Sequence, residues 1–382
     1  MPMTSPLRNL HAQAEAEFTV FPPPGSVCAG DSEPVEIVET FGDLDLERAA
    51  LATGAGLLDC PHRAVLTLTG ADRLDLLDRV LTQNVGDLAP GRWAPAFLLN
   101  RQGRILADLR VIPLDDRVLL ELHSAVAAAA QETLDGFIFT EDAAVTLPPV
   151  DEAPLVLDLI GPGADAALSR TAGSVDWTPG PGERSAAALT IADAGVIALR
   201  DGGRHVPSLT LIAARASAVS VYHHVLESGA GDGADSVRAV GWRAVDEQRV
   251  RARVPLHLME FGSSSLPHET GVLHDRVSFT KGCYPGQEIV ARMQSRGGAK
   301  QLLVALTMSV PTPPAIGAPL RQADEPDADA IGVVTSAAPG TDGAPAVALA
   351  QVRAKHAAVG AGLRVGDDQR AVLDELIGAE TP

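Results

Sequence analysis

The stretch "KGCYPGQEIVAR", residues 281–292, bears most directly on the fold and chemistry of this chain. Gly282 allows a tight turn, and Pro285 suits the first position of a helix because its missing backbone N–H needs no partner there. We therefore expect a helix to begin at Pro285, with Cys283 just before its N-terminus. The helix dipole and the ammonium group of Lys281 would both favour the thiolate form of Cys283. The alternative is that Cys283 is a small buried hydrophobe beside a helix start.

The size and charge of the chain limit the classes of protein to which it can belong. With 382 residues, of which 46% are hydrophobic, it is long enough for two or three domains. Its formal net charge of −19 repels nucleic acid over most of the surface, so we do not expect tight direct binding to tRNA. No apolar run is long enough to cross a membrane. We take a monomer as the default.

The cysteine content favours a reducing compartment. The cysteines at positions 28, 60 and 283 form no CxxC pair, and an odd number argues against a disulfide framework. The N-terminal residues lack the basic and apolar segments of a secretory signal, so we predict a cytoplasmic protein. Cys, His and acidic residues do not pair at metal-site spacings, and we predict no metal site.

Three stretches of different texture divide the chain. Residues 1–43 are rich in Pro, Gly and Ser near their middle, and we predict an extended N-terminal arm. Residues 44–298 mix strands and helices without regular βαβ alternation, which indicates an α+β fold. In this part an alternating strand over 63–70 precedes an amphipathic helix over 71–81. Residues 299–382 contain short strands between Pro and Gly turns, which predict a small C-terminal β-barrel.

A predicted antiparallel meander over residues 94–123 contains one acidic candidate. Asp108 lies in its middle strand, which is largely apolar. A carboxylate there could accept two parallel hydrogen bonds from the amino and ring N–H groups of a planar heterocycle. The alternative is that Asp108 points outward from a half-exposed strand.

Basic residues cluster in two stretches of this acidic chain. Residues 249–253 carry three arginines, and residues 281–300 carry four cations, Lys281, Arg292, Arg296 and Lys300, against one acid. If the two stretches meet, they form a cationic site for carboxylate or phosphate groups. The alternative is a solvated helix, because the charges are spaced by four as in surface ion pairs. Tyr284 is one of two tyrosines, and its ring could stack on a ligand or pack in the core.

Residues 281–288 resemble the K-G-C-Y-x-G-Q-E signature of the YgfZ family, the folate-binding relatives of the glycine-cleavage T-protein (aminomethyltransferase). Every fixed position of the signature is matched. Residues 56–91 are also similar to the opening of the T-protein fold, with its strand, T-G turn and helix. The resemblance covers roughly residues 44–380 and leaves the N-terminal arm outside.

The resemblance implies a three-lobed aminomethyltransferase-like fold, with tetrahydrofolate or a folate derivative at its centre and the β-barrel as third lobe. It implies a role in iron–sulfur cluster assembly or repair, linked in bacteria to tRNA modification. Folate and iron–sulfur client or assembly proteins would be the partners. The matching positions assign Cys283 and Lys281 to a reactive-thiol site, and Asp108, Arg249 and Tyr284 to folate binding.

The chain departs from true aminomethyltransferases at several positions. Their paired acids after the meander turn correspond to Ala107 and Asp108, so one acid is missing. The acid and closing glycine of their R-L-E-A-G stretch correspond to Arg251 and Arg253. Missing acids weaken pterin recognition and activation of an aminomethyl donor, so aminomethyl transfer in glycine cleavage is the alternative to the iron–sulfur function. A non-catalytic interaction module on the same fold is a third interpretation.

Overall fold

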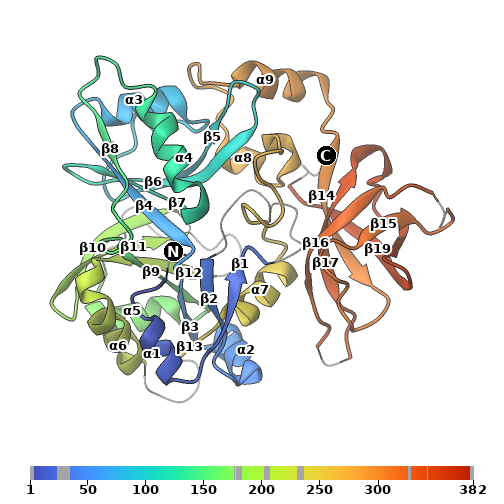
Figure 1. Ribbon diagram of the computed structural model, residues 1–382, viewed down its shortest axis with the longest axis horizontal. Helices are drawn as coiled ribbons and strands as arrows, with labels where there is room; N and C mark the ends of the chain where they lie inside the picture. Colours follow the sequence, from blue (N-terminus) through green and yellow to red (C-terminus); the bar gives the residue numbers. More distant parts are fainter. Residues whose placement is uncertain are drawn as a thin grey trace.

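The computed structural model consists of three lobes (Figure 1), two built around a β-sheet with helices and the third a closed β-barrel. The structure describes residues 4–23, 35–175, 177, 183–201, 207–229, 236–325, 328–341 and 343–378. Helices and strands mix without a regular alternation, as the α+β prediction requires. No helix in the described part of the chain has the length and apolarity needed to cross a bilayer.

The first lobe contains a five-stranded antiparallel sheet in the order β5-β6-β7-β4-β8. Its elements are β4 (Arg63–Thr69), α3 (Arg73–Val80), β5 (Ala94–Leu99), β6 (Ile105–Pro113), β7 (Val118–His123), α4 (Ser124–Asp135) and β8 (Ala144–Thr146). Apolar side chains of α3 and α4 pack on the sheet in one core cluster. The strand, helix and meander predicted for this region are confirmed.

The second lobe contains a six-stranded sheet in the order β10-β11-β12-β9-β3-β13, in which only the described pair β13–β3 is parallel. Its strands are β3 (Ala55–Asp59), β9 (Leu155–Ile160), β10 (Ser185–Ile191), β11 (Ala194–Arg200), β12 (Ser208–Ala213) and β13 (Val237–Ala239). Helices α5 (Ala164–Ala172) and α6 (Ala218–Ser228) contribute apolar side chains to its core, and a short 3₁₀ helix (Arg215–Ser217) precedes α6.

The N-terminal residues form structure of their own, so the prediction of an extended arm is wrong for the described part of residues 1–43. They contain α1 (Arg8–Gln13) and a hairpin of β1 (Glu17–Phe21) and β2 (Val35–Thr40). Leu7 and Phe21 are buried, and so are Val35 and Ile37 of β2, so apolar side chains of this segment pack into the core. Most of the Pro-, Gly- and Ser-rich middle, with Cys28, lies outside the described residues.

Two helices lie next to the hairpin, α2 (Leu44–Thr53) and α7 (Trp242–Arg251). Helix α7 also packs on the barrel strands β16 and β17. The barrel closes in the order β14-β17-β16-β15-β18-β19, as predicted for the C-terminal part. Its elements are β14 (Gln301–Met308), β15 (Pro319–Gln322), β16 (Gly332–Ala338), β17 (Val347–Arg353), a 3₁₀ turn (Ala354–His356), β18 (Gly362–Val365) and β19 (Gln369–Leu376).

The segment between α7 and the barrel crosses back to the first lobe. It contains a 3₁₀ turn (Pro267–Glu269), α8 (Leu273–Arg276) and α9 (Gln287–Arg296), and Figure 1 shows α9 at the top of the molecule, away from the hairpin. The backbone of Ser278 donates to the carbonyl of Thr82, which ties this segment to the first lobe.

Candidate functional site

A cavity of about 240 Å³ lies where the two sheets, the N-terminal hairpin and helix α7 meet. Its wall combines two kinds of side chain, ion pairs and aromatic or imidazole rings. The lining residues are Phe21, Leu58, His62, Arg63, Asp108, Leu109, Arg110, Glu121, Leu122, His123, Asp158, Trp242, Val245, Arg249, Leu256, His257 and Arg276. They come from nine different parts of the chain, so the site exists only in the folded protein.

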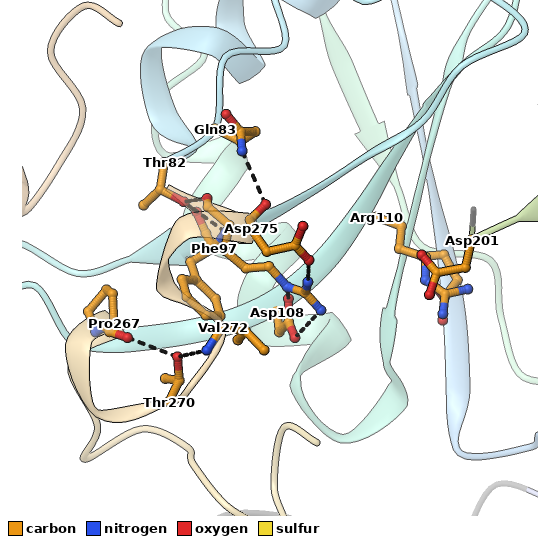
Figure 2. Close-up of polar contacts among 12 residues, drawn as sticks. Thr82, Gln83, Phe97, Asp108, Arg110, Asp201, Pro267, Thr270, Val272 and Asp275 are labelled. Carbon is orange, nitrogen blue, oxygen red and sulfur yellow. Dashed lines mark hydrogen bonds and ion pairs between the residues drawn. The ribbon is translucent and has the colours of Figure 1, made fainter. Parts of the chain in front are cut away.

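Asp108, which the sequence analysis assigns to folate binding, lies on the wall of this cavity and comes from strand β6. Its carboxylate accepts from Nε of Arg276 at 3.1 Å and from the second guanidinium nitrogen at 3.5 Å (Figure 2). The side chain of Asp275 holds the same guanidinium from another side. Burial lowers the pKa of Arg276, but Asp108 and Asp275 outweigh burial and raise it above its ordinary value, so Arg276 stays a cation.

The neighbouring Ala107 has the opposite orientation. It is buried in the core cluster of the first lobe and lies across from Leu98 in β5. Successive side chains of a strand point to opposite faces of the sheet. Ala107 therefore points into the core, and its neighbour Asp108 points into the cavity. An acid at position 107 would therefore be buried among apolar groups. Its absence removes no carboxylate from the cavity, contrary to our expectation that losing it weakens the site.

A second ion-pair group lies deeper in the sheets. Arg63 donates to both oxygens of Asp158, at 2.8 and 2.9 Å, and to Glu121. Arg110 lies 3.5 Å from Glu121 and donates to Thr210, whose hydroxyl donates to Asp158 at 2.6 Å. Burial raises the pKa of Glu121 and Asp158, but Arg63 and then Arg110 hold both below their ordinary values. Both acids remain ionised at neutral pH.

The other end of the cavity is a group of rings. The ring of Phe21 lies 4.8 Å from that of His62, 5.1 Å from that of His123 and 4.8 Å from that of Trp242, centroid to centroid. Burial, followed by the charge of Arg63, lowers the pKa of His62 to about 4. Burial also lowers the pKa of His123 well below its ordinary value. Both imidazoles are therefore neutral at pH 7.

Two imidazole nitrogens in this group have no hydrogen-bond partner among the described residues, Nδ1 of His62 and Nε2 of His123. Nδ1 of His123 accepts the backbone N–H of Ala125 at 3.1 Å. A neutral imidazole carries its proton on the other nitrogen when one nitrogen accepts, so Nε2 of His123 is a buried donor. Buried polar groups in proteins nearly always have partners. The hydrogen-bonding capacity of these two nitrogens is therefore unused among the described residues, and a polar ligand could supply the missing partners.

Arg249 also lines the cavity, but its guanidinium is already engaged. It donates to Asp246 at 2.8 Å, to Glu260 at 3.0 Å and to Ser336 of the barrel at 2.7 Å. Burial lowers its pKa, but the two carboxylates outweigh burial and the net shift is upward. Arg249 thus joins α7 to the barrel and presents only part of its side chain to the cavity.

Lys281 fastens the segment that follows α8 to the end of α3. Its Nζ donates to the carbonyls of Leu81 and Gln83 at 3.0 and 2.8 Å, and to both the carbonyl and the carboxylate of Asp78. Its side chain is 2% exposed. Burial lowers the pKa of Lys281, and the hydrogen bond with Asp78 opposes this effect only in part. The ammonium group satisfies carbonyls at a helix C-terminus, a structural role that we did not predict.

Cys283 is exposed, which excludes the alternative of a buried hydrophobe. The predicted helix start is wrong, however. Gly286 caps α9 with a φ of 81°, and the helix begins at Gln287, so Pro285 is not its first residue. A Cβ on Gly286 would lie 2.7 Å from the carbonyl oxygen of Asn100, which explains glycine at this position. Cys283 is four positions before the helix and outside its first turn.

Tyr284 is buried next to Phe97 and Phe261 in an apolar cluster. None of Lys281, Cys283 and Tyr284 is among the described residues that line the cavity. The structure therefore separates the predicted site residues into two places. Asp108 and Arg249 lie at the cavity. Lys281, Cys283 and Tyr284 lie in a segment that Lys281 fastens to the end of α3, and we call residues 281–284 the clasp.

Four cations of the predicted cationic site already form ion pairs within the protein, namely Arg249, Arg251, Arg253 and Lys281. Arg251 contacts Glu247 and the carbonyl of Pro339, and Arg253 contacts Glu375. Arg253 has a φ of 59°, a left-handed conformation that suits glycine and explains the glycine of the family stretch at this position. The side chain of Arg296 lies outside the described residues. In the described part of the chain, no group of three His, Cys, Asp or Glu residues could hold a metal ion.

Comparison with known proteins identifies the family. A model of the GCVT N-terminal domain matches residues 31–281 of the chain. Two aminomethyltransferases are each 30% identical to it, one from Streptomyces avermitilis that covers 94% of this chain and 91% of its own length, the other from Streptomyces coelicolor that covers 84% of both. The chain belongs to the GCVT aminomethyltransferase family.

The family fold extends over nearly the whole molecule. The crystal structure of glycine cleavage system aminomethyltransferase T from Bartonella henselae superimposes with a TM-score of 0.81, covers 99% of this chain and 98% of its own, and is 22% identical. A chloroplastic protein of Arabidopsis thaliana, named as a transferase, is 24% identical over 97% of this chain. The family match begins at residue 31, so strand β1 and Phe21 precede the matched part.

Proposed function

We propose that the central cavity binds a tetrahydrofolate derivative, with the pterin ring next to Asp108. The observation that carries this proposal is the Asp108 carboxylate on the cavity wall, held in place by the single guanidinium of Arg276. A carboxylate has about four lone-pair positions, so it can still accept the amino and ring N–H groups of a pterin. The resemblance to the folate-binding relatives of the T-protein assigns the same residue to the same task.

The size and polarity of the cavity suit one part of a folate. Pockets that enclose a whole drug-sized ligand measure about 300–1,000 Å³. A cavity of about 240 Å³ suits the bicyclic ring and leaves the remainder of the molecule outside. His62 and His123 also line this cavity, and each has one buried imidazole nitrogen without a partner among the described residues. Bound tetrahydrofolate would supply the nitrogen atoms that accept one-carbon units.

Titration with tetrahydrofolate and 5-formyltetrahydrofolate tests the proposal. Trp242 lines the cavity, so binding should quench tryptophan fluorescence with micromolar or tighter affinity. Asp108→Asn removes the charge of the acceptor and should weaken binding by about 10- to 100-fold, which corresponds to the loss of one or two charge-assisted hydrogen bonds. Asp116→Asn, in the exposed turn after β6, is the matched control and should bind like the wild type. No quenching by either folate would refute the proposal and favour the interaction module.

For the biological role we propose a YgfZ-type function in iron–sulfur cluster assembly or repair, with Cys283 as the acting thiol. The exposed position of Cys283 within the K-G-C-Y-x-G-Q-E signature supports this role. Complementation of a strain with failing iron–sulfur enzymes tests it. Cys283→Ser should abolish rescue, whereas Cys28→Ser, which removes another thiol, should leave rescue intact. Full rescue by Cys283→Ser would refute the thiol role without affecting the folate proposal.

Aminomethyl transfer is the alternative function. The names of the relatives support it better than they support the iron–sulfur role, and the orientation of Ala107 also favours it. Because the missing acid would face the core, the cavity keeps the carboxylate that faces a ligand. The test is to supply tetrahydrofolate and the aminomethylated lipoyl carrier protein and to measure ammonia and methylene-tetrahydrofolate. Turnover that depends on Asp108 but not on Cys283 would establish the transferase and displace the iron–sulfur role.

A further inference from the structure

One part of the cavity wall comes from neither of the two large sheets. Phe21 ends strand β1, which pairs only with β2 among the described strands. Moving the Phe21 side chain would therefore break no hydrogen bond of the five- or six-stranded sheet. Most other wall residues lie on strands of those sheets or on helix α7 and cannot move independently. Phe21 is therefore a wall side chain whose displacement leaves both large sheets intact.

The Phe21 ring occupies a site built for a ring. It is stacked on His123, with 26° between the planes, tilted against His62 and edge-on to Trp242. It is 2% exposed, so these contacts enclose it. The rings of His62, His123 and Trp242 therefore enclose a space that fits a planar ring.

Phe21 is nevertheless a poor chemical partner for this site. His62 and His123 both contact the Phe21 ring, each is 8% exposed, and Nδ1 of His62 and Nε2 of His123 are buried without a partner among the described residues. Nε2 of His123 is a donor, and Nδ1 of His62 is a donor or an acceptor according to its tautomer. A phenyl ring has no atom that can bond to either. A ring with nitrogen atoms or amino groups in its plane does.

We propose that Phe21 is a displaceable plug over a subsite for a planar nitrogen heterocycle, formed by His62, His123 and Trp242. The heterocycle takes the place of the phenyl ring, keeps contact with Trp242 and turns its edge toward the two imidazole nitrogens, because a hydrogen bond to an imidazole nitrogen forms in the plane of that imidazole. Only the identification of this heterocycle with a pterin rests on the proposed function. Displacing the plug also enlarges a cavity that is too small for a whole folate.

A pair of probes of the same shape tests the plug without using folate. Benzimidazole and indene are fused bicycles of similar size, but only benzimidazole has ring nitrogens. Phe21→Ala should bind benzimidazole, measured by ligand-observed NMR or calorimetry, at least about tenfold more tightly than indene, as expected for one net hydrogen bond. Val20 is an exposed residue of the same strand, so Val20→Ala is the control. The wild type and Val20→Ala should each bind both probes at least tenfold more weakly than Phe21→Ala does.

Two further variants keep the test decisive. Phe21→Leu retains an apolar side chain in case Phe21→Ala does not fold, and it should show the same preference at lower affinity. Phe21→Ala/His123→Asn should lose the preference for benzimidazole and bind indene unchanged. Asparagine can keep the hydrogen bond to Ala125 that caps α4, but it removes the imidazole N–H. Equal binding of the two probes by Phe21→Ala, or no binding of benzimidazole by either Phe21 variant, would overturn the proposal.

Folate itself gives a separate result. Phe21→Ala should bind 5-formyltetrahydrofolate about tenfold more tightly than the wild type, because no plug has to be displaced. Weaker binding would mean that Phe21 holds the ligand and would overturn the plug. If neither protein binds folate, the proposed function fails, whereas the benzimidazole and indene result still decides the nature of the subsite.

Discussion

The central cavity and the clasp around Lys281 differ in how their residues come together. The cavity collects side chains from both sheets, a hairpin and two helices, and no two of its charged groups form a recognisable motif. The clasp is a contiguous motif, yet its residues do three different things. Lys281 fastens carbonyls at the end of α3, Tyr284 fills a core and Cys283 faces solvent.

This difference shows that a strong sequence motif need not be the binding site. A motif of adjacent residues can hold loops together and leave one reactive group exposed. A binding cavity can be assembled from residues with no local signature. The predictions below separate the structural role of the clasp from the ligand-binding role of the cavity.

The largest expected effect concerns the clasp. Lys281→Met removes a buried cation and leaves the carbonyls of Leu81 and Gln83 without their donor, so the free energy of unfolding should fall by about 2–4 kcal/mol. Urea denaturation measures this change. Lys300→Met, at an exposed lysine, is the control and should change stability by less than about 0.5 kcal/mol. Equal effects of the two substitutions would contradict the structural role of Lys281.

The pH dependence of stability reports on the ring end of the cavity. The pKa of His62 falls from its ordinary 6.5 to about 4 on folding. Between these values the unfolded chain binds a proton that the folded chain does not. The free energy of unfolding should therefore be at its full value above pH 6.5 and fall as the pH drops towards 4, by on the order of 3 kcal/mol from this group. His123 acts in the same direction.

His62→Gln should flatten this dependence, whereas His224→Gln, at an exposed histidine of α6, should not. Unfolding curves at pH 4.5, 5.5 and 7 are sufficient. An unchanged slope in His62→Gln would show that His62 is not a buried neutral group, and the hydrogen-bonding argument for the subsite would fail with it.

The smallest expected effects distinguish two cysteines. Burial raises the pKa of Cys60 well above its ordinary value, and its side chain is 1% exposed, whereas Cys283 is exposed. Iodoacetamide followed by peptide mass mapping should modify Cys283 in the native protein and Cys60 only after unfolding. Cys60→Ser should cost about 1–3 kcal/mol, and Cys283→Ser less than about 0.5 kcal/mol. Rapid native modification of Cys60 would contradict its burial in the core cluster between the two sheets.

Much of the fold could be predicted because its elements follow local patterns. The strand and helix over residues 63–81, the meander over 94–123 and the barrel show alternation, helical spacing and turn residues. The hairpin that carries Phe21 was not predicted. Its two short strands are separated by a Pro- and Gly-rich stretch, and only tertiary packing shows that Phe21, Val35 and Ile37 are buried.

The candidate site was predicted less completely, for the same reason. Asp108 and Arg249 could be placed at the cavity because family motifs surround them. Arg276, His62 and His123 have no such motif, and their roles appear only when β4, β7 and α8 come together. Polar residues at the borders of apolar strands, as in "CPHRAVL" (residues 60–66), were the available signal. The role of Lys281 was missed because its partners lie about 200 positions earlier.

A crystal structure of the complex with 5-formyltetrahydrofolate tests the central claim most directly. We predict that the pterin ring lies in the central cavity, with its amino and ring N–H groups within hydrogen-bonding distance of the Asp108 carboxylate. A ring bound anywhere else, for example beside Cys283, or a saturated crystal in which the cavity holds no folate, would contradict the account.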